Sequence, residues 1–133
     1  MRKIKGFFRF LLLLVILSGV LVIYSGHKKY EEALNSLPIE QAIDEIRSID
    51  NYTKISDVPN IYKNSVIALE DRRFYLHNGF DIVGIVRAII TDIKEKALVE
   101  GASTITQQLA KNMYFLNDRS PTRKIAEIFI SMI

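Results

Sequence analysis

The pattern of hydrophobic and polar residues separates one uninterrupted apolar run from a series of amphipathic segments. Residues 10–23 read FLLLLVILSGVLVI without a charge, and Gly6–Gly26 has about the 20 residues that a membrane-crossing helix needs. Four cations precede this run, which favours a cytoplasmic N-terminus. The alternative is a cleaved signal peptide, but the bulky Tyr24 stands where the cleavage site wants a small residue. We therefore expect an uncleaved anchor with the remainder of the chain outside the cytoplasm.

Beyond the apolar run the chain changes character twice, so we divide it into four regions. A basic cytoplasmic tail covers residues 1–9 and the transmembrane anchor covers residues 10–26. Residues 27–56 are rich in acids and contain Pro38, and we interpret them as a stalk. Residues 57–133 contain repeated helix signals and form the expected functional domain.

Four helices are predicted within that domain, and no segment shows the alternation typical of a strand. The first follows Asp57-Val-Pro-Asn and runs to Glu70, and the second starts after Asp81. The second carries an apolar stripe with helical spacing, which we expect in the core: Ile82, Ile85, Val86, Ile89, Ile90 and Ile93. The pattern therefore predicts a mostly α fold.

The third and fourth helices are predicted from their capping residues. Thr104 and Gln107 have capping-box spacing, and Ser120-Pro121 opens the last helix. The inward residues expected on the third helix are Ile105, Leu109, Met113 and Leu116, and those on the fourth are Ile125, Ile128, Phe129 and Met132.

Charge and composition exclude several classes of function. The net charge of +3 comes from the N-terminal tail, since from Ser25 onward 14 Lys and Arg stand against 15 Asp and Glu. We therefore expect no nucleic-acid partner. The chain has no cysteine, which excludes disulfides and thiolate metal sites.

Candidate chemistry lies on the polar sides of the predicted helices. The stretch EDRRFYLHNG starts with the acids Glu70 and Asp71, and the last helix carries Glu127 beside Arg123 and Lys124. Taken singly, such groups are ordinary solvated surface. Together, two carboxylates on separate helices suit a reaction at a sugar anomeric carbon. Neighbouring cations lower the pKa of a carboxylate and suit a phosphate leaving group, which favours transfer from a sugar diphosphate over hydrolysis.

Three segments stand out in this domain: EDRRFYLHNGFD at Glu70–Asp81, GASTITQQLAKN at Gly101–Asn112 and RKIAE at Arg123–Glu127. They resemble the first three motifs of the peptidoglycan glycosyltransferase family, which comprises the transglycosylase domain of penicillin-binding proteins and the monofunctional transglycosylases. The resemblance covers about half of the chain, from Ser65 to Ile133. It implies a lysozyme-like α-helical domain that polymerises lipid II, the lipid-linked disaccharide-pentapeptide, at the cell membrane.

The resemblance also implies roles for individual residues. Glu70 would be the general base, Asp71 would support it, and His77 would shape the loop that follows. Since His77 is one of only two histidines in the chain, we expect it to be a structural hydrogen-bonding group and not a catalyst. Glu127 would assist departure of the leaving group directly or through a divalent metal, Mg²⁺ or Mn²⁺. Arg87 occupies a matching position in the second helix. The donor substrate and its pyrophosphate would contact Ser103, Thr104, Gln107, Gln108, Lys111, Asn112, Arg119, Arg123 and Lys124.

Expected partners are lipid II, the growing glycan chain, the membrane and other proteins of wall synthesis. Two alternatives remain open: a lysozyme-like lytic hydrolase of peptidoglycan, and a non-catalytic membrane-anchored partner of the wall-synthesis machinery. Members of the family continue with further helices, whereas this chain stops inside the amphipathic helix that ends at Ile133. We therefore expect the domain to be truncated at its C-terminus.

Overall fold

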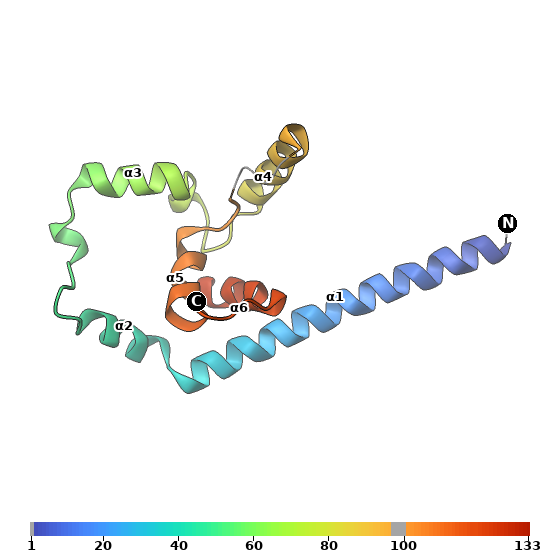
Figure 1. Cartoon of the computed structure of the whole chain (residues 1–133), viewed down its shortest axis with the longest axis horizontal. Helices are drawn as coiled ribbons and strands as arrows, with labels where there is room; N and C mark the ends of the chain where they lie inside the picture. The colour runs from blue at the N-terminus through green and yellow to red at the C-terminus, as the bar shows by residue number, and fades with distance from the viewer. Residues whose placement is uncertain (1, 97–100) are drawn as a thin grey trace.

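The structure is a computed structural model that describes residues 2–96 and 101–133, and within those ranges it is helical and has no strand. Figure 1 shows α1 as a long rod, with α2 and α3 leading away from its C-terminal end and α6 lying back beside it. This result confirms the mostly α prediction. The helices are α1 (Arg2–Ser36), α2 (Ile39–Arg47), α3 (Asn60–Glu70), α4 (Ile82–Glu95), α5 (Ile105–Tyr114) and α6 (Pro121–Ser131), with short 3-10 turns η1 (Ile55–Asp57) and η2 (Phe74–Leu76).

Helix α1 contains the apolar run and continues well past it. Its segment Lys5–Ser36 is long and apolar enough to cross a membrane, and its most apolar window is not buried against the rest of the protein. The sequence analysis placed the end of the anchor at residue 26 and a stalk beyond it. In the structure the same helix continues to Ser36, and α2 follows after Pro38. The anchor and the first ten residues of the stalk are thus one element.

The packed part of the molecule lies where α6 meets α1 and α5 (Figure 1). Ala110 of α5 and Phe115, the residue after that helix, pack with Ala126 and Ile130 of α6, and these four residues form the buried core. Partly buried side chains of α1 and α5 cover this core: Tyr30, Ala33 and Tyr114. Alanines at the centre let the helix axes approach closely, which is why α6 is the most enclosed helix of the described chain.

Helices α3 and α4 project away from this core, and their apolar faces are exposed. The prediction that the α4 stripe lies in the core is wrong for the described structure, since Ile89 is 53% exposed and Ile93 is 71% exposed. The buried residues of α4 are Gly84 and Ala88 instead. Helical periodicity determines which side of a helix is apolar, but burial needs a second element on that side. The same correction applies to residues predicted inward on α5 and α6, namely Leu109, Leu116 and Met132.

The total exposed surface reflects this open arrangement. The protein exposes 10537 Å², whereas a compact monomer of 15.3 kDa would expose about 7,100 Å². The excess comes from the exposed rod of α1 and from the uncovered faces of α3 and α4 (Figure 1).

The loop between α3 and α4 is tied to the core at one glycine. Gly79 has a φ of 81°, a left-handed conformation that favours glycine. Its carbonyl oxygen accepts a hydrogen bond of 2.6 Å from the Thr104 hydroxyl at the start of α5. A Cβ added at Gly79 would overlap the Ser131 carbonyl at the end of α6. This contact joins the loop, α5 and α6 at a single point.

Candidate active site

A cleft of about 710 Å³ lies between the C-terminal end of α3 and residues of α4, α5 and α6. All the predicted site residues except Asp71, Thr104 and Arg119 line it. The lining residues are Leu69, Glu70, Arg72, Arg87, Gly101, Ser103, Gln107, Gln108, Lys111, Asn112, Arg123, Lys124 and Glu127. Three segments that are far apart in the sequence thus meet around one hollow.

Glu70 is the last residue of α3, and its carboxylate is exposed at the mouth of the cleft. The Gln108 side chain on α5 donates a hydrogen bond of 2.8 Å to Glu70 Oε2. This bond uses one of the two carboxylate oxygens and orients the group. The other oxygen stays available to a ligand in the cleft, as a proton acceptor requires.

Asp71 is buried beside the cleft and holds the start of α5. Its Oδ2 accepts a hydrogen bond of 3.1 Å from the backbone N–H of Ile105, and its Oδ1 lies 2.9 Å from His77 Nε2. The first N–H groups of a helix have no partner inside the helix, so an acidic side chain is well placed there. The adjacent acids Glu70 and Asp71 therefore contact α5 at residues 108 and 105, one helical turn apart. Asp71 is a supporting residue, since it lies outside the cleft.

The carboxylate of Asp81, at the start of α4, is held by Arg73 in the loop after α3. Arg73 Nε donates to both oxygens of Asp81, at 3.1 and 3.3 Å. Burial alone would raise the pKa of Asp81, but the Gly84 amide, Arg73 and the nearby His77 lower that pKa below its ordinary value. Asp71, His77 and Asp81 bring ligand atoms within 4.8 Å of one another. Their oxygens already accept from Arg73, His77 and the Ile105 amide, so we interpret this group as structural.

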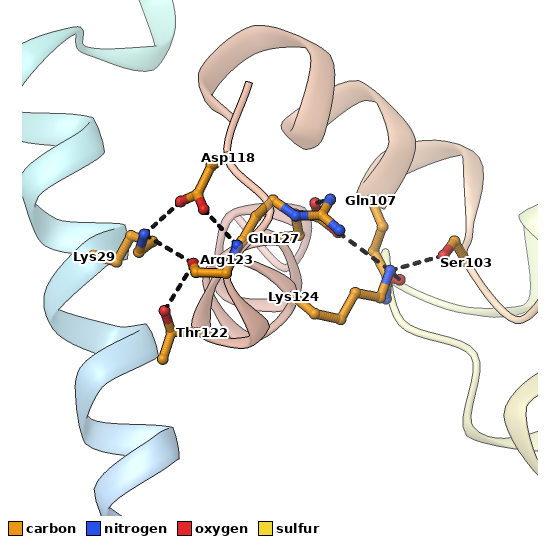
Figure 2. Close-up of polar contacts among 9 residues, drawn as sticks. Lys29, Ser103, Gln107, Asp118, Thr122, Arg123, Lys124 and Glu127 are labelled. Atoms are coloured by element: carbon orange, nitrogen blue, oxygen red, sulfur yellow. Dashed lines mark hydrogen bonds and ion pairs between the residues drawn. The ribbon is translucent and has the colours of Figure 1, made fainter. Parts of the chain in front are cut away.

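Glu127 occupies the inner wall of the cleft, and it is only 2% exposed. Arg123 Nη1 donates to its Oε1, and Lys124 Nζ lies 3.2 Å from its Oε2. Lys124 also donates to Ser103 Oγ and Gln107 Oε1, each at 2.8 Å (Figure 2). These contacts form a row of alternating charges and dipoles across α6 and α5. In this pair Glu127 is buried and Arg123 is half-buried, whereas the sequence alone also allowed an exposed surface pair.

The donor set around Glu127 does not fit the divalent metal that the resemblance implied. A metal ion binds carboxylate oxygens that are not shared with cations, and it usually has several such ligands. Here both oxygens of Glu127 accept from cationic side chains. Among the residues that the structure describes, the cluster suited to a metal is the one at Asp71, and Glu127 is not part of it. We derive no step through a metal.

Several hydrogen-bond donors of the cleft wall have no partner within the described protein. Gln107 Nε2 and Arg123 Nε are buried without an acceptor, and Lys111 is exposed on the next turn of α5. Buried donors without acceptors are costly unless a ligand satisfies them. Five cations line the cleft against the two glutamates: Arg72, Arg87, Lys111, Arg123 and Lys124. The arrangement is suited to an anion with several oxygens, such as a pyrophosphate.

The remaining predicted residues lie beside the cleft. Thr104 is buried and is the N-cap of α5, where its hydroxyl accepts from the Gln107 amide at 3.2 Å. Arg119 is exposed in the turn before α6 and is not part of the cleft wall. The sequence analysis missed Arg72, which lines the cleft directly. Its position two residues after Glu70 was the available signal.

Comparison with known proteins agrees with the geometry of the cleft. A family model described as Transglycosylase matches residues 28–133. The chain is 46% identical over 92 residues to a monofunctional glycosyltransferase of Staphylococcus epidermidis, which covers 67% of this chain and 34% of that protein. It is 45% identical over 92 residues to a monofunctional glycosyltransferase of Staphylococcus aureus, with the same coverage. The matched region is thus about a third of the length of these relatives.

Proposed function

Since the chain belongs to the transglycosylase family, we propose that its cleft is the active site of a peptidoglycan glycosyltransferase that polymerises lipid II into glycan strands. The observation that carries the proposal is the contrast between the two glutamates. Glu70 is open to the cleft with one oxygen available, whereas Glu127 is buried with both oxygens held by cations. Glu70 can thus accept a proton, and Glu127 holds the side chains of Arg123 and Lys124 in place.

In the proposed reaction Glu70 accepts the proton of the acceptor sugar's 4-hydroxyl. The oxygen of that hydroxyl forms a bond with the anomeric carbon of the donor, and the bond from that carbon to the lipid pyrophosphate breaks. The departing pyrophosphate carries the negative charge. Lys111, Arg123 and Lys124 would stabilise it, and Glu127 keeps the last two cations in place.

The alternative of a lytic hydrolase is less well supported. A glycosidase protonates a poor alkoxide leaving group with a carboxylic acid held in an apolar pocket. Glu127 is buried, but each of its carboxylate oxygens contacts a cation, Arg123 or Lys124. Glu70 is exposed and contacts Gln108. Neither acid has the surroundings of a proton donor, whereas the cationic wall suits a phosphate leaving group that needs no proton.

The position of the cleft supports a lipid-linked substrate. We propose that α1 crosses the membrane with its basic N-terminal end in the cytoplasm, so that α2–α6 lie at the outer surface. Four cations lie before the apolar run. Because α1 continues without a break into the segment that packs on α6, the cleft is held close to the bilayer.

The test is polymerisation of a fluorescent lipid II by the detergent-solubilised full chain. We expect glycan strands from the wild type and a loss of at least about a hundredfold in Glu70→Gln, since a general base contributes that much. Glu95→Gln is the matched control, because Glu95 is an exposed acid at the end of α4, outside the cleft. Polymerisation that survives in Glu70→Gln would contradict the role of this residue.

A second measurement separates the transferase from a non-catalytic partner. If the wild type makes no polymer, binding of the fluorescent lipid II to the protein in detergent is measured by anisotropy. Tight binding without turnover would favour the non-catalytic alternative, and release of sugars from preformed wall would favour the hydrolase. Neither result would agree with the proposed reaction.

A further inference from the structure

The part of α1 outside the membrane makes a specific interface with α6. The residues concerned are Gly26–Ala33, which we call the docking turns. Lys29 Nζ contacts Asp118 Oδ2 and donates to Ser120 Oγ at 3.1 Å (Figure 2). Asp118 Oδ1 in turn accepts from the Ser120 amide at 2.7 Å. One lysine of α1 thus holds the turn that starts α6.

The same interface has a close backbone approach. Gly26 is buried, and an added Cβ would overlap the side chain of Ile125 on α6. Gly19 provides a comparison within the same helix, because an added Cβ there would meet nothing within 4 Å. The glycine at position 26 therefore allows α6 to lie directly on α1, in addition to any effect on helix propensity.

Three aromatic side chains pack together at the same interface, directly beside Gly26 and Lys29. The ring centroids of His27 and Phe129 are 5.1 Å apart, those of His27 and Tyr30 are 5.4 Å apart, and those of Tyr30 and Phe129 are 5.6 Å apart. Edge-to-face and tilted aromatic pairs add to the stabilisation that comes from burial alone. The ion pair of Lys29, the close contact at Gly26 and the aromatic cluster all lie within residues 26–30 of α1, little more than one helical turn. They contact α6 and the turn before it from Asp118 to Phe129.

Helix α6 therefore contacts α1 on one side and lines the cleft on the other. Thr122, Ile125 and Phe129 face α1, while Arg123, Lys124 and Glu127 line the cleft. Figure 2 shows the Lys29 contacts and the Lys124 contacts on opposite sides of the same helix. A rigid helix transmits a shift on one side to the other, so a displaced docking turn would move the cations of the cleft.

We propose that the docking turns of α1 are a positioning element of the cleft: Lys29 and Gly26 hold α6 so that Arg123, Lys124 and Glu127 stand in register with Glu70. Neither residue lines the cleft, so both act through α6. The consequence for activity rests on the proposed function, whereas the interface itself does not. The helix from Gly6 to Gly26 spans about 30 Å, which places the docking turns directly outside the bilayer.

The first test measures docking without using activity. The chain has no cysteine, so Ile125→Cys introduces a single thiol at the interface. Its labelling by a membrane-impermeant maleimide is followed in the full chain reconstituted in vesicles. Docking is expected to protect the thiol in the otherwise native chain. Gly26→Leu should raise the labelling rate roughly tenfold by overpacking the interface, and Gly19→Leu should leave it unchanged. If the thiol at position 125 is labelled at the same rate with and without Gly26→Leu, the proposal is overturned.

The second test asks whether docking sets the reaction rate. Lys29→Met is expected to lower kcat for fluorescent lipid II roughly tenfold with little change in KM, because the contacts that serve the transition state are displaced. Lys28→Met is the matched control, since Lys28 is exposed and pairs with Glu32 on its own helix. Lys29→Arg should restore part of the rate, because arginine keeps the charge that pairs with Asp118.

The outcomes separate the two proposals. A raised labelling rate with unchanged kcat in Lys29→Met would overturn the positioning role. An inactive wild type in which Gly26→Leu still exposes the thiol would contradict the proposed function and leave the interface standing. Loss of helicity in Lys29→Met would be seen by circular dichroism, and in that case the labelling rates at position 125 decide the question.

Discussion

Helices α4 and α6 have similar amphipathic patterns, but the apolar side of α4 is exposed whereas that of α6 is largely buried. The α4 stripe of isoleucines and valines has cleaner helical spacing, yet Ile89 is 53% exposed. Helix α6 has cations and a glutamate within its pattern, and Ile130 on it is 5% exposed and Ala126 fully buried. The difference lies in the neighbours, because α1 and α5 cover α6 from two sides and no described element covers the stripe of α4. An amphipathic pattern indicates a need for a partner, whereas burial depends on whether the fold supplies one.

The two regions also differ in the kind of interaction that holds them. The region of α1, α5 and α6 combines a small apolar core with charged contacts on both sides of α6. The end of α3 and the start of α4 are held mainly by polar contacts to α5, through Glu70, Asp71 and Gly79. The cleft lies between these two regions, one packed around an apolar core and the other held by polar contacts. Substitutions at that boundary are the sharpest way to test the comparison.

The largest effect is expected at the tie between the regions. Gly79→Ala should destabilise the protein by about 3 kcal/mol or more, because alanine disfavours the left-handed backbone and its Cβ would overlap the Ser131 carbonyl. The measurement is chemical denaturation of the detergent-solubilised chain followed by circular dichroism. Gly101→Ala is the control, since an added Cβ there would meet nothing within 4 Å. Equal stability of the two variants would show that the tie at Gly79 does not hold the loop.

A smaller effect should distinguish the two amphipathic helices directly. Ile130→Ala is expected to cost about 2–3 kcal/mol by leaving a cavity between α5 and α6. Ile89→Ala removes the same atoms from an exposed position and should cost less than about 1 kcal/mol. Thermal unfolding of both variants beside the wild type provides the comparison. If Ile89→Ala costs as much as Ile130→Ala, the face of α4 is covered in solution and the contrast between the helices fails.

The smallest effect is expected from acid. Lys29 and the Ser120 groups hold the pKa of Asp118 well below its usual range, and the Gly84 amide and Arg73 outweigh burial to lower the pKa of Asp81. A carboxylate whose pKa is depressed by folding stabilises the protein above its unfolded pKa, near 3.8, and the stabilisation is lost as pH falls through the folded value. The melting temperature should therefore decrease below about pH 4.

One variant assigns this acid effect to the packed region. In Lys29→Met the charge that depresses the pKa of Asp118 is absent. The decrease in melting temperature between pH 6 and pH 2 should then be shallower than in the wild type. Lys28→Met keeps the Lys29 contact and should retain the wild-type slope. Identical slopes in all three chains would show that Asp118 contributes nothing to acid sensitivity.

Much of the local structure was predictable from the sequence because it depends on short-range physics. The charge-free run of α1, the N-cap at Thr104 and the proline at the start of α6 follow from hydropathy, capping and the fixed φ of proline. The same holds for the absence of strands within residues 2–96 and 101–133. The adjacent acids Glu70 and Asp71, followed by two arginines, are also chemically unusual in the sequence itself.

What only the tertiary structure decided concerns contacts between residues that are far apart in the chain. Three examples are the hydrogen bond from Gln108 to Glu70, the bond from Lys124 to Gln107 beside the buried Glu127, and the ion pair of Lys29 and Asp118. Each joins residues that are between 17 and 89 positions apart in the chain. Hydropathy periods describe one helix at a time, so they could not show that α4 stays uncovered or that α1 packs against α6. The sequence determined which helices form and which groups they carry. Their packing decided which acid is open, which is held by cations, and how α1 packs against α6.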